Sequence, residues 1–214
     1  MIHNSVNNLV LIKKEIQLKN DNIKIIAVSK TFPIENILPL IEFGHIDYGE
    51  NKVKEALDKW TNIKNENKSV KLHLIGKLQT NKVKLALGIF DYIHSLDSEK
   101  LAIKISEEQI KQEKKPKIFI QVNIGDENQK SGINKNEINN LLNYCIKLDL
   151  TVIGFMCIPP AKINTAIYFK EMNKLNKTYN FTELSMGMSS DYLEAAQSNA
   201  TYLRIGSSIF GQRF

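Results

Sequence analysis

Eight short apolar runs alternate with amphipathic segments along the chain, and this alternation restricts the possible folds more than any other feature. The apolar periodicity predicts strands over residues 23–28, 46–48, 71–75, 90–94, 118–124, 151–157, 183–186 and 202–205. Strict alternation of strands and helices is typical of a parallel sheet in an α/β protein, and eight such units favour a closed (β/α)8 TIM barrel over an open, doubly wound sheet.

The helical pattern supports closure of this barrel and predicts one extra helix at the amino terminus. Helices are expected over residues 5–18, 33–44, 53–60, 79–87, 96–112, 135–147, 161–179 and 191–198. Too few residues follow the eighth strand for a full covering helix, so the helix at 5–18 can cover that gap. With 214 residues and no linker or repeat, we expect one domain over residues 1–214.

Composition restricts the classes of partner. The formal net charge of +6 comes from lysines dispersed among acidic residues, without aromatic interleaving, which argues against a nucleic-acid-binding surface. Cys145 and Cys157 lack metal-ligand spacing, so we expect free buried thiols and no metal site. The apolar part of the first 16 residues is too short for a signal peptide, and no later stretch could span a bilayer. We expect a cytoplasmic monomer without membrane contact.

Lys30 follows the first apolar strand directly, within the segment IIAVSKTFP of residues 25–33. Ligands of α/β proteins bind at the carboxyl ends of the strands, which is where this amine would lie. Partial burial would lower its pKa and make it a nucleophile able to form a Schiff base. The alternative is that Lys30 is one of many lysines whose side chains extend to water.

Two loops rich in glycine and serine follow the seventh and eighth predicted strands. They read MGMSSD from Met186 and RIGSS from Arg204. In barrels, the backbone N–H groups of these two loops often hold a phosphate group. The alternative is that glycine and serine only form tight turns and helix caps. Because the first and eighth strands are neighbours in a closed barrel, Lys30 and these loops could together hold a phosphorylated aldehyde.

The same segments resemble those of a known family. The motifs AVSKTFP, FGHIDYGENKVKEA, LHLIGKLQTNK, VNIGDENQKSGI, GFMCIPP, LSMGMSSDYLEA and RIGSSIFGQR are similar, in the same order, to those of the pyridoxal phosphate homeostasis protein family. The resemblance runs from about residue 25 to the end of the chain. It implies the barrel of the alanine racemase amino-terminal domain and pyridoxal 5′-phosphate (PLP) as cofactor.

The resemblance also implies a set of cofactor-binding residues: Lys30, Asn51, Ser189, Arg204, Gly206 and Ser207. By this similarity, Lys30 forms the Schiff base, Asn51 lies near the cofactor, and Arg204 faces the pyridine nitrogen. The other three hold the phosphate. The departures from the family pattern are Lys77, where proline is common, and Gly125, where serine is common; neither belongs to the implied site.

Three further side chains are weaker candidates. Lys130 resembles a family lysine discussed as a second PLP contact, with a solvated loop charge as the alternative. Tyr48 and His73, at predicted strand ends, could act as a general base, or could be packed ring side chains with satisfied polar atoms.

The leading hypothesis is a protein of PLP homeostasis that is not an enzyme. It would hold PLP as a Schiff base and buffer it or deliver it to PLP-dependent apo-enzymes, as the resemblance implies. A guanidinium beside the ring nitrogen disfavours the pyridinium form and weakens PLP as an electron sink. The alternatives are a weak PLP-dependent amino-acid racemase and a PLP-independent Schiff-base aldolase.

Overall fold

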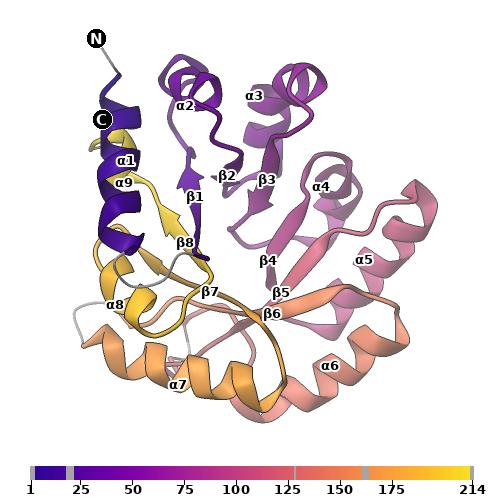
Figure 1. Cartoon of the computed structure of the whole chain (residues 1–214). Helices are drawn as coiled ribbons and strands as arrows, with labels where there is room; N and C mark the ends of the chain where they lie inside the picture. The colour runs from indigo at the N-terminus through magenta and orange to yellow at the C-terminus, as the bar shows by residue number, and fades with distance from the viewer. Residues whose placement is uncertain (1–2, 18–21, 128, 161–163, 213–214) are drawn as a thin grey trace.

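A closed barrel of eight parallel strands forms the centre of the computed structural model, which describes residues 3–17, 22–127, 129–160 and 164–212 (Figure 1). Each strand pairs with its sequence neighbours, and β1 also pairs with β8, with Lys24 opposite Tyr202. The strands are β1 Lys24–Val28, β2 Asp47–Glu50, β3 Lys71–Leu74, β4 Tyr92–Leu96, β5 Lys117–Val122, β6 Val152–Cys157, β7 Glu183–Met188 and β8 Tyr202–Ile205. The predicted (β/α)8 barrel is confirmed.

Helices surround the barrel on its outer side (Figure 1). The α-helices are α1 Asn4–Gln17, α2 Leu38–Glu42, α3 Val53–Glu66, α4 Val83–Ile89, α5 Glu99–Gln112, α6 Ile138–Lys147, α7 Thr165–Thr178, α8 Tyr192–Gln197 and α9 Ser207–Phe210, and the 3-10 turns are η1 Ile34–Asn36, η2 Thr80–Lys82 and η3 Lys135–Glu137. In the part of the chain that the structure describes, none of these helices has the length and apolar character needed to cross a membrane.

The extra amino-terminal helix covers the gap left by the short last helix, as predicted. Helix α9 has only four residues, and α1 lies beside it in Figure 1. The side-chain amide of Asn8 in α1 donates a hydrogen bond to the carbonyl oxygen of Ile209 in α9, at 3.0 Å. The apolar face of α1, which includes Leu9 and Ile12, is buried against the barrel.

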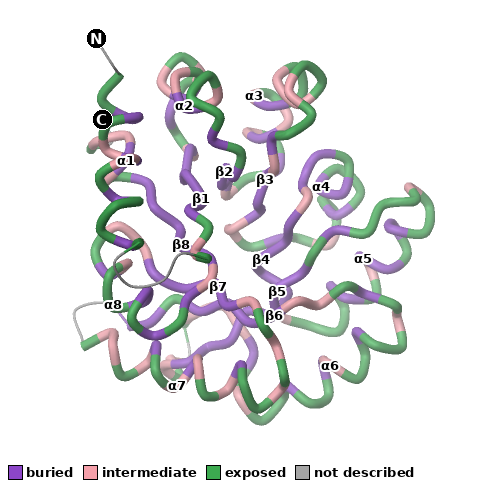
Figure 2. Tube along the Cα trace, viewed as in Figure 1, coloured by how far each residue is buried: buried purple, intermediate pink, exposed green. Residues whose placement is uncertain are grey.

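Two regions of buried side chains stabilise the fold. The larger lies between the strands and the helices, and the smaller fills the barrel interior with Ile26, Val28, Tyr92, Phe119, Met156 and Tyr202. Figure 2 shows the strands as mostly buried. Because both faces of such strands are covered, they appear in the sequence as nearly continuous apolar runs.

Some predicted boundaries were wrong, for identifiable local reasons. The helix predicted over residues 33–44 is divided into η1 and α2, with Pro39 in the first turn of α2, where its missing N–H is tolerated. Strand β5 ends at Val122 instead of residue 124, because the side chain of Asn123 bonds the backbone N–H and C=O of Glu127 and closes a turn. Residue 18 and residues 161–163, at two predicted helix ends, lie outside the described residues.

Candidate functional site

The carboxyl end of β1 carries Lys30, which is half-buried. The preceding residue, Ser29, is buried and donates a hydrogen bond from its hydroxyl to Oε1 of Glu50, at 2.7 Å. The same carboxylate oxygen accepts hydrogen bonds from Nε1 of Trp60 and Nζ of Lys59, both at 3.0 Å. This buried carboxylate therefore joins the end of β1, the end of β2 and helix α3, and it holds the backbone that presents Lys30.

The residue after Lys30 has an unusual backbone conformation. Thr31 has a φ of +68°, in the left-handed region that β-branched residues rarely adopt. Its backbone N–H donates to Oε1 of Glu55, at 2.6 Å. Burial alone would raise the pKa of Glu55, but this hydrogen bond and the ammonium of Lys59 together lower it. Strain of this kind persists only where surrounding contacts enforce it, and here it lies beside the candidate nucleophile.

Asn51 follows β2 and is half-buried. The backbone of the next loop lies against it, because a Cβ on Gly76 would be 2.4 Å from the backbone oxygen of Asn51. Gly49, two residues before Asn51, faces the barrel interior, where a Cβ would be 2.8 Å from Ile26. These two glycines were not among the predicted site residues, although both belong to the motifs FGHIDYGENKVKEA and LHLIGKLQTNK.

Ser189 joins the loops that follow β7 and β8. Its hydroxyl oxygen accepts hydrogen bonds from the backbone N–H groups of Gly206, at 3.2 Å, and Ser208, at 3.3 Å. The hydroxyl of Ser208 donates to the carbonyl oxygen of Ser189, at 3.4 Å. Ser207 is exposed, so Ser208 is the serine of this loop that contacts Ser189. Ser208 was not among the predicted site residues, since a motif does not show which of two adjacent hydroxyls points inward.

The loop after β7 has its own anchor in Asp191. Oδ1 of this buried side chain accepts a hydrogen bond from the backbone N–H of Met188, at 2.6 Å. Burial raises the pKa of Asp191, and the hydrogen bond from Met188 and the charge of Arg204 oppose that rise. Gly187 is required before this turn because its φ is +87° and a Cβ would be 2.5 Å from Ala195.

Arg204 lies inside the barrel and is only 4% exposed. One guanidinium nitrogen, Nη1, donates to Oγ of Ser185 at 2.7 Å, and Nη2 donates to the carbonyl oxygen of Cys157 at 2.8 Å. Burial lowers the pKa of Arg204, but arginine keeps its proton in proteins. The site therefore contains a buried, permanent positive charge.

The fold brings the predicted site residues to one region of the barrel. Strand β1 lies between β2 and β8, and β7 pairs with β8, so the four strands are consecutive around the barrel. The residues that these strands and the loops after them contribute are Lys30, Asn51, Ser189, Arg204, Gly206 and Ser207. An amine, backbone N–H groups, a hydroxyl and a guanidinium are suited to an anionic ligand with an electrophilic carbon.

Two of the weaker candidates, Tyr48 and Lys130, make contacts with other protein groups. Tyr48 is buried against Trp60 outside the barrel, and its hydroxyl donates to the carbonyl oxygen of His45 at 3.1 Å. Burial strongly raises the pKa of Tyr48, which disfavours the phenolate that a general base would need. Lys130 forms an ion pair with Glu127 at 2.5 Å and donates to the carbonyl oxygen of Pro159 at 3.1 Å.

His73 was expected at a strand end and lies instead in the centre of the barrel. It is fully buried, and both ring nitrogens have hydrogen-bond partners, Asp47 and His94. Neither nitrogen is available to a ligand. The prediction of a general base at the barrel mouth is therefore wrong for His73, and the alternative of a satisfied imidazole is correct.

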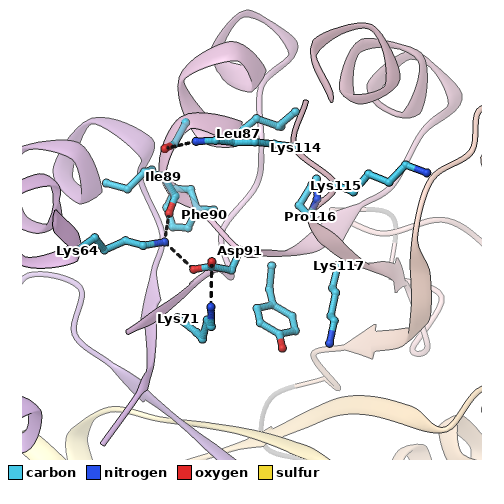
Figure 3. A pocket seen from close by; sticks show the side chains of 12 residues that line it. Lys64, Lys71, Leu87, Ile89, Phe90, Asp91, Lys114, Lys115, Pro116 and Lys117 are labelled. Atoms are coloured by element: carbon cyan, nitrogen blue, oxygen red, sulfur yellow. Dashed lines mark hydrogen bonds and ion pairs between the residues drawn. The ribbon is translucent and has the colours of Figure 1, made fainter. Parts of the chain in front are cut away.

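A lysine-rich pocket of about 440 Å³ lies at the amino-terminal ends of β4 and β5, on the face opposite the candidate site (Figure 3). Its ammonium groups already have partners: Lys64 pairs with Asp91 at 2.6 Å, and Lys114 donates to the carbonyl oxygen of Gly88 at 3.0 Å. Lys71 lies 3.8 Å from the same carboxylate. These contacts indicate lysines that satisfy helix carboxyl ends, so we do not assign a ligand to this pocket.

Comparison with known proteins gives matches over nearly the whole chain. Residues 4–213 match the family model described as the alanine racemase N-terminal domain. The pyridoxal phosphate homeostasis protein of Aquifex aeolicus is 38% identical over 200 residues, covering 89% of this chain and 87% of that protein. The homeostasis protein of Escherichia coli K12 is 32% identical over 203 residues, covering 90% and 87%.

Solved structures show the same architecture. The structure of PipY from Synechococcus elongatus with PLP bound superposes with a TM-score of 0.88 at 29% identity, covering 97% of this chain and all of that one. Alanine racemase of Clostridium difficile superposes with a TM-score of 0.72 at 15% identity and supports the fold alone. This chain spans 57% of that racemase.

Proposed function

The chain belongs to the pyridoxal phosphate homeostasis protein family, and on this premise we propose that it binds PLP and holds it for buffering or for delivery to apo-enzymes. Support comes from a PipY structure that contains PLP and from relatives named for PLP homeostasis. One observation from the site carries the proposal: Lys30 follows β1, and the loops that Ser189 joins follow β8, which pairs with β1, and β7, which pairs with β8.

The donors of the site fit the cofactor. Two backbone N–H groups, of Gly206 and Ser208, converge on one hydroxyl oxygen, as they could converge on a phosphate oxygen. PLP supplies an aldehyde that forms a Schiff base with a primary amine, and we assign this amine to Lys30. The network of Ser29, Glu50 and Glu55 holds the backbone around Lys30 in place.

Arg204 and the burial of the two candidate bases support binding without strong catalysis. A permanently charged guanidinium beside the pyridine nitrogen would oppose protonation of the ring and reduce its capacity to stabilise a carbanion. Tyr48 and His73, the candidates for a general base, are both fully buried and bonded to other groups. We therefore propose a carrier whose reversible Schiff base limits free aldehyde and leaves PLP transferable.

The proposal is tested by absorption spectroscopy of the purified protein, mixed with PLP, before and after borohydride reduction. We expect a visible band that reduction removes, and a pyridoxyl group on the peptide that contains Lys30. Lys30→Ala should lose the covalent adduct but retain weak binding through the phosphate. Lys130→Ala is the matched control and should keep the adduct, since this lysine already contacts Glu127 and Pro159.

Other outcomes separate the alternatives. A protein that PLP cannot colour would refute PLP binding and favour the aldolase hypothesis. Steady loss of optical rotation from an enantiopure amino acid would indicate a racemase. Transfer of bound PLP to an added apo-enzyme, measured as recovery of that enzyme's activity, would support delivery.

A further inference from the structure

A continuous hydrogen-bonded chain of five side chains crosses the barrel interior from Asp47 to Arg204. Oδ1 of Asp47 lies 3.0 Å from Nε2 of His73, and Nδ1 of His73 lies 3.0 Å from Nε2 of His94. Nδ1 of His94 lies 2.9 Å from Oγ of Ser185, which accepts from Arg204 at 2.7 Å. The side chains come from five different strands and meet only because the barrel is closed.

The carboxylate end of this hydrogen-bonded chain, together with neutral rings, assigns a direction to its hydrogen bonds. Arginine has only donors and a carboxylate has only acceptors. Asp47 therefore accepts the N–H at Nε2 of His73, so a neutral His73 accepts at Nδ1 from Nε2–H of His94. A neutral His94 in turn accepts at Nδ1 from the O–H of Ser185, whose oxygen accepts from Arg204. With neutral rings, each proton lies on Nε2 and every donor points away from Arg204.

The surroundings hold these groups in place and isolate them from water. His73, His94 and Ser185 are fully buried. The ring of His73 stacks on Tyr92 with centroids 4.1 Å apart, and the ring of His94 stacks on Phe119 at 4.3 Å. Burial lowers the pKa of both histidines, and for His94 the positive charge of Arg204 adds to the effect. For His73 the hydrogen bond and charge of Asp47 oppose the effect of burial, but the net direction is still a lowered pKa, which favours a neutral ring.

The charged groups around the hydrogen-bonded chain include two carboxylates: Asp191, whose charge acts on Arg204 through space, and Asp47, which hydrogen bonds connect to it. Within the described part of the molecule, no carboxylate lies within ion-pair distance of its guanidinium. Besides Asp47, the titratable groups that act on the members of the hydrogen-bonded chain are Lys24 from β1, Tyr92 from β4, Cys157 from β6 and Tyr202 from β8, together with Asp91 before β4 and Asp191 after β7. Asp47 is the one carboxylate of this set that the hydrogen bonds connect to Arg204.

We propose that Asp47, His73, His94 and Ser185 are positioning residues that orient Arg204 and couple its charge to a carboxylate at the opposite end of the barrel. This inference rests on the proposed function, which places Arg204 at the pyridine nitrogen of PLP. We call the hydrogen-bonded side chains from Asp47 to Ser185 the relay. The relay would hold the guanidinium of Arg204 where it opposes protonation of the pyridine ring of PLP. An apolar barrel interior could fill the same space but could not direct an N–H group of Arg204.

The first test uses the ligand-free protein and requires no cofactor. Nuclear magnetic resonance of ¹⁵N-labelled histidine reports the protonated nitrogen of each ring. We expect His73 and His94 to be neutral, with the proton on Nε2, from about pH 8 down to about pH 6, where an ordinary histidine begins to gain its second proton. A proton on Nδ1 of either ring, or titration of either ring in this range, would overturn the assigned direction of the relay.

The second test compares two buried serines in the PLP-loaded protein. Ser185→Ala interrupts the relay beside Arg204, whereas Ser95→Ala removes a hydroxyl that is equally buried but has no hydrogen-bond partner. We expect the pH midpoint of the PLP absorption band to shift by about 0.5 unit or more in Ser185→Ala and to stay at the wild-type value in Ser95→Ala. A folded Ser185→Ala protein with a wild-type midpoint would overturn the proposal.

The remaining outcomes are distinguishable. Asp47→Asn keeps an acceptor for His73 and removes the charge, so it should shift the same midpoint and serves where Ser185→Ala does not fold. If neither variant folds, the histidine protonation states of the wild-type protein decide. Failure of wild-type protein to bind PLP refutes the proposed function, while the ligand-free measurement still reports whether the relay exists.

Discussion

The hydroxyl oxygen of Ser189 accepts a hydrogen bond from the backbone N–H of Gly206, at 3.2 Å, and so joins the loops after two neighbouring strands. A second N–H group, of Ser208, points at the same oxygen. Ser189 therefore holds the two loops together, so a phosphate group bound there would order little additional backbone.

Substitution of Ser189 should weaken phosphate binding. In a Lys30→Ala background, where binding depends on the phosphate, Ser189→Ala should lower PLP affinity about threefold to tenfold, the effect of losing one hydrogen bond. Isothermal titration calorimetry measures this change. Ser190→Ala is the matched control, since Ser190 is exposed and adjacent, and its affinity should equal that of the background. Equal losses in both variants would contradict the role of Ser189.

Removal of the buried charge of Glu50 should destabilise the fold near Lys30. Glu50→Gln keeps the shape but weakens the bonds to Ser29, Lys59 and Trp60, so we expect the free energy of unfolding to fall by about 1–3 kcal/mol. Urea unfolding followed by tryptophan fluorescence measures the change. Asp58→Asn, at an exposed position of α3, should leave the unfolding midpoint unchanged. A Glu50→Gln protein as stable as the wild type would show that the network is dispensable.

A methyl group at Gly76 should disturb the site through the backbone of Asn51. The Cβ of Gly76→Ala would lie 2.4 Å from the backbone oxygen of Asn51, so the loop after β3 must move, at a cost of about 1–3 kcal/mol. Thermal unfolding and PLP titration should both show a loss. At Gly88 in α4 a Cβ meets nothing within 4 Å, so Gly88→Ala should be neutral or stabilise by about 0.5–1 kcal/mol. The same response in both variants would contradict the predicted clash.

Stability should decrease in mild acid because His45 is buried in its neutral form. Burial, reinforced by the charge of Lys13, lowers the pKa of His45 to about 4. The unfolded chain, with an ordinary histidine pKa of about 6.5, binds the proton first, so stability is full above about pH 6.5 and is lost as pH falls towards 4. At about 1.4 kcal/mol per pKa unit, this loss approaches about 3 kcal/mol.

Urea unfolding at several pH values between about 7 and 4.5 tests this dependence. His45→Gln retains a side-chain donor for the carbonyl oxygen of Asp47, which His45 contacts at 2.9 Å, and should show a smaller slope of stability against pH. His73 and His94 contribute in the same direction, so some slope should remain in this variant. A wild-type stability that is constant over this range would refute the prediction.

The sequence predicted the architecture because the order of strands and helices is encoded in local patterns of apolar residues. Apolar runs such as residues 202–205 predict strands wherever both faces are covered, and β8 occupies the predicted residues. Boundaries were less certain where polar residues are buried: β2 has the sequence DYGE and extends to Glu50, since its polar groups are satisfied by neighbouring elements. Local periodicity contains no information about such partners.

The candidate site also has a part that the sequence could suggest and a part that only the structure shows. The residue types and their places after predicted strands made Lys30 and Ser189 candidates, and the family resemblance implied Arg204; their contacts with PLP stay a prediction. The sequence did not show that Ser208 contacts Ser189 while Ser207 faces solvent, since that depends on how two loops pack.

By itself, the sequence determined that the chain forms eight strand–helix units with a lysine and two small-residue loops at strand ends. Only the tertiary structure decided that His73 and His94 are enclosed between Asp47 and Arg204. His94 and Ser185 are 91 positions apart, and closure of the barrel brings them to 2.9 Å. The cost of burying polar groups then requires each of them to find a partner across the interior, which no local pattern of residues can specify.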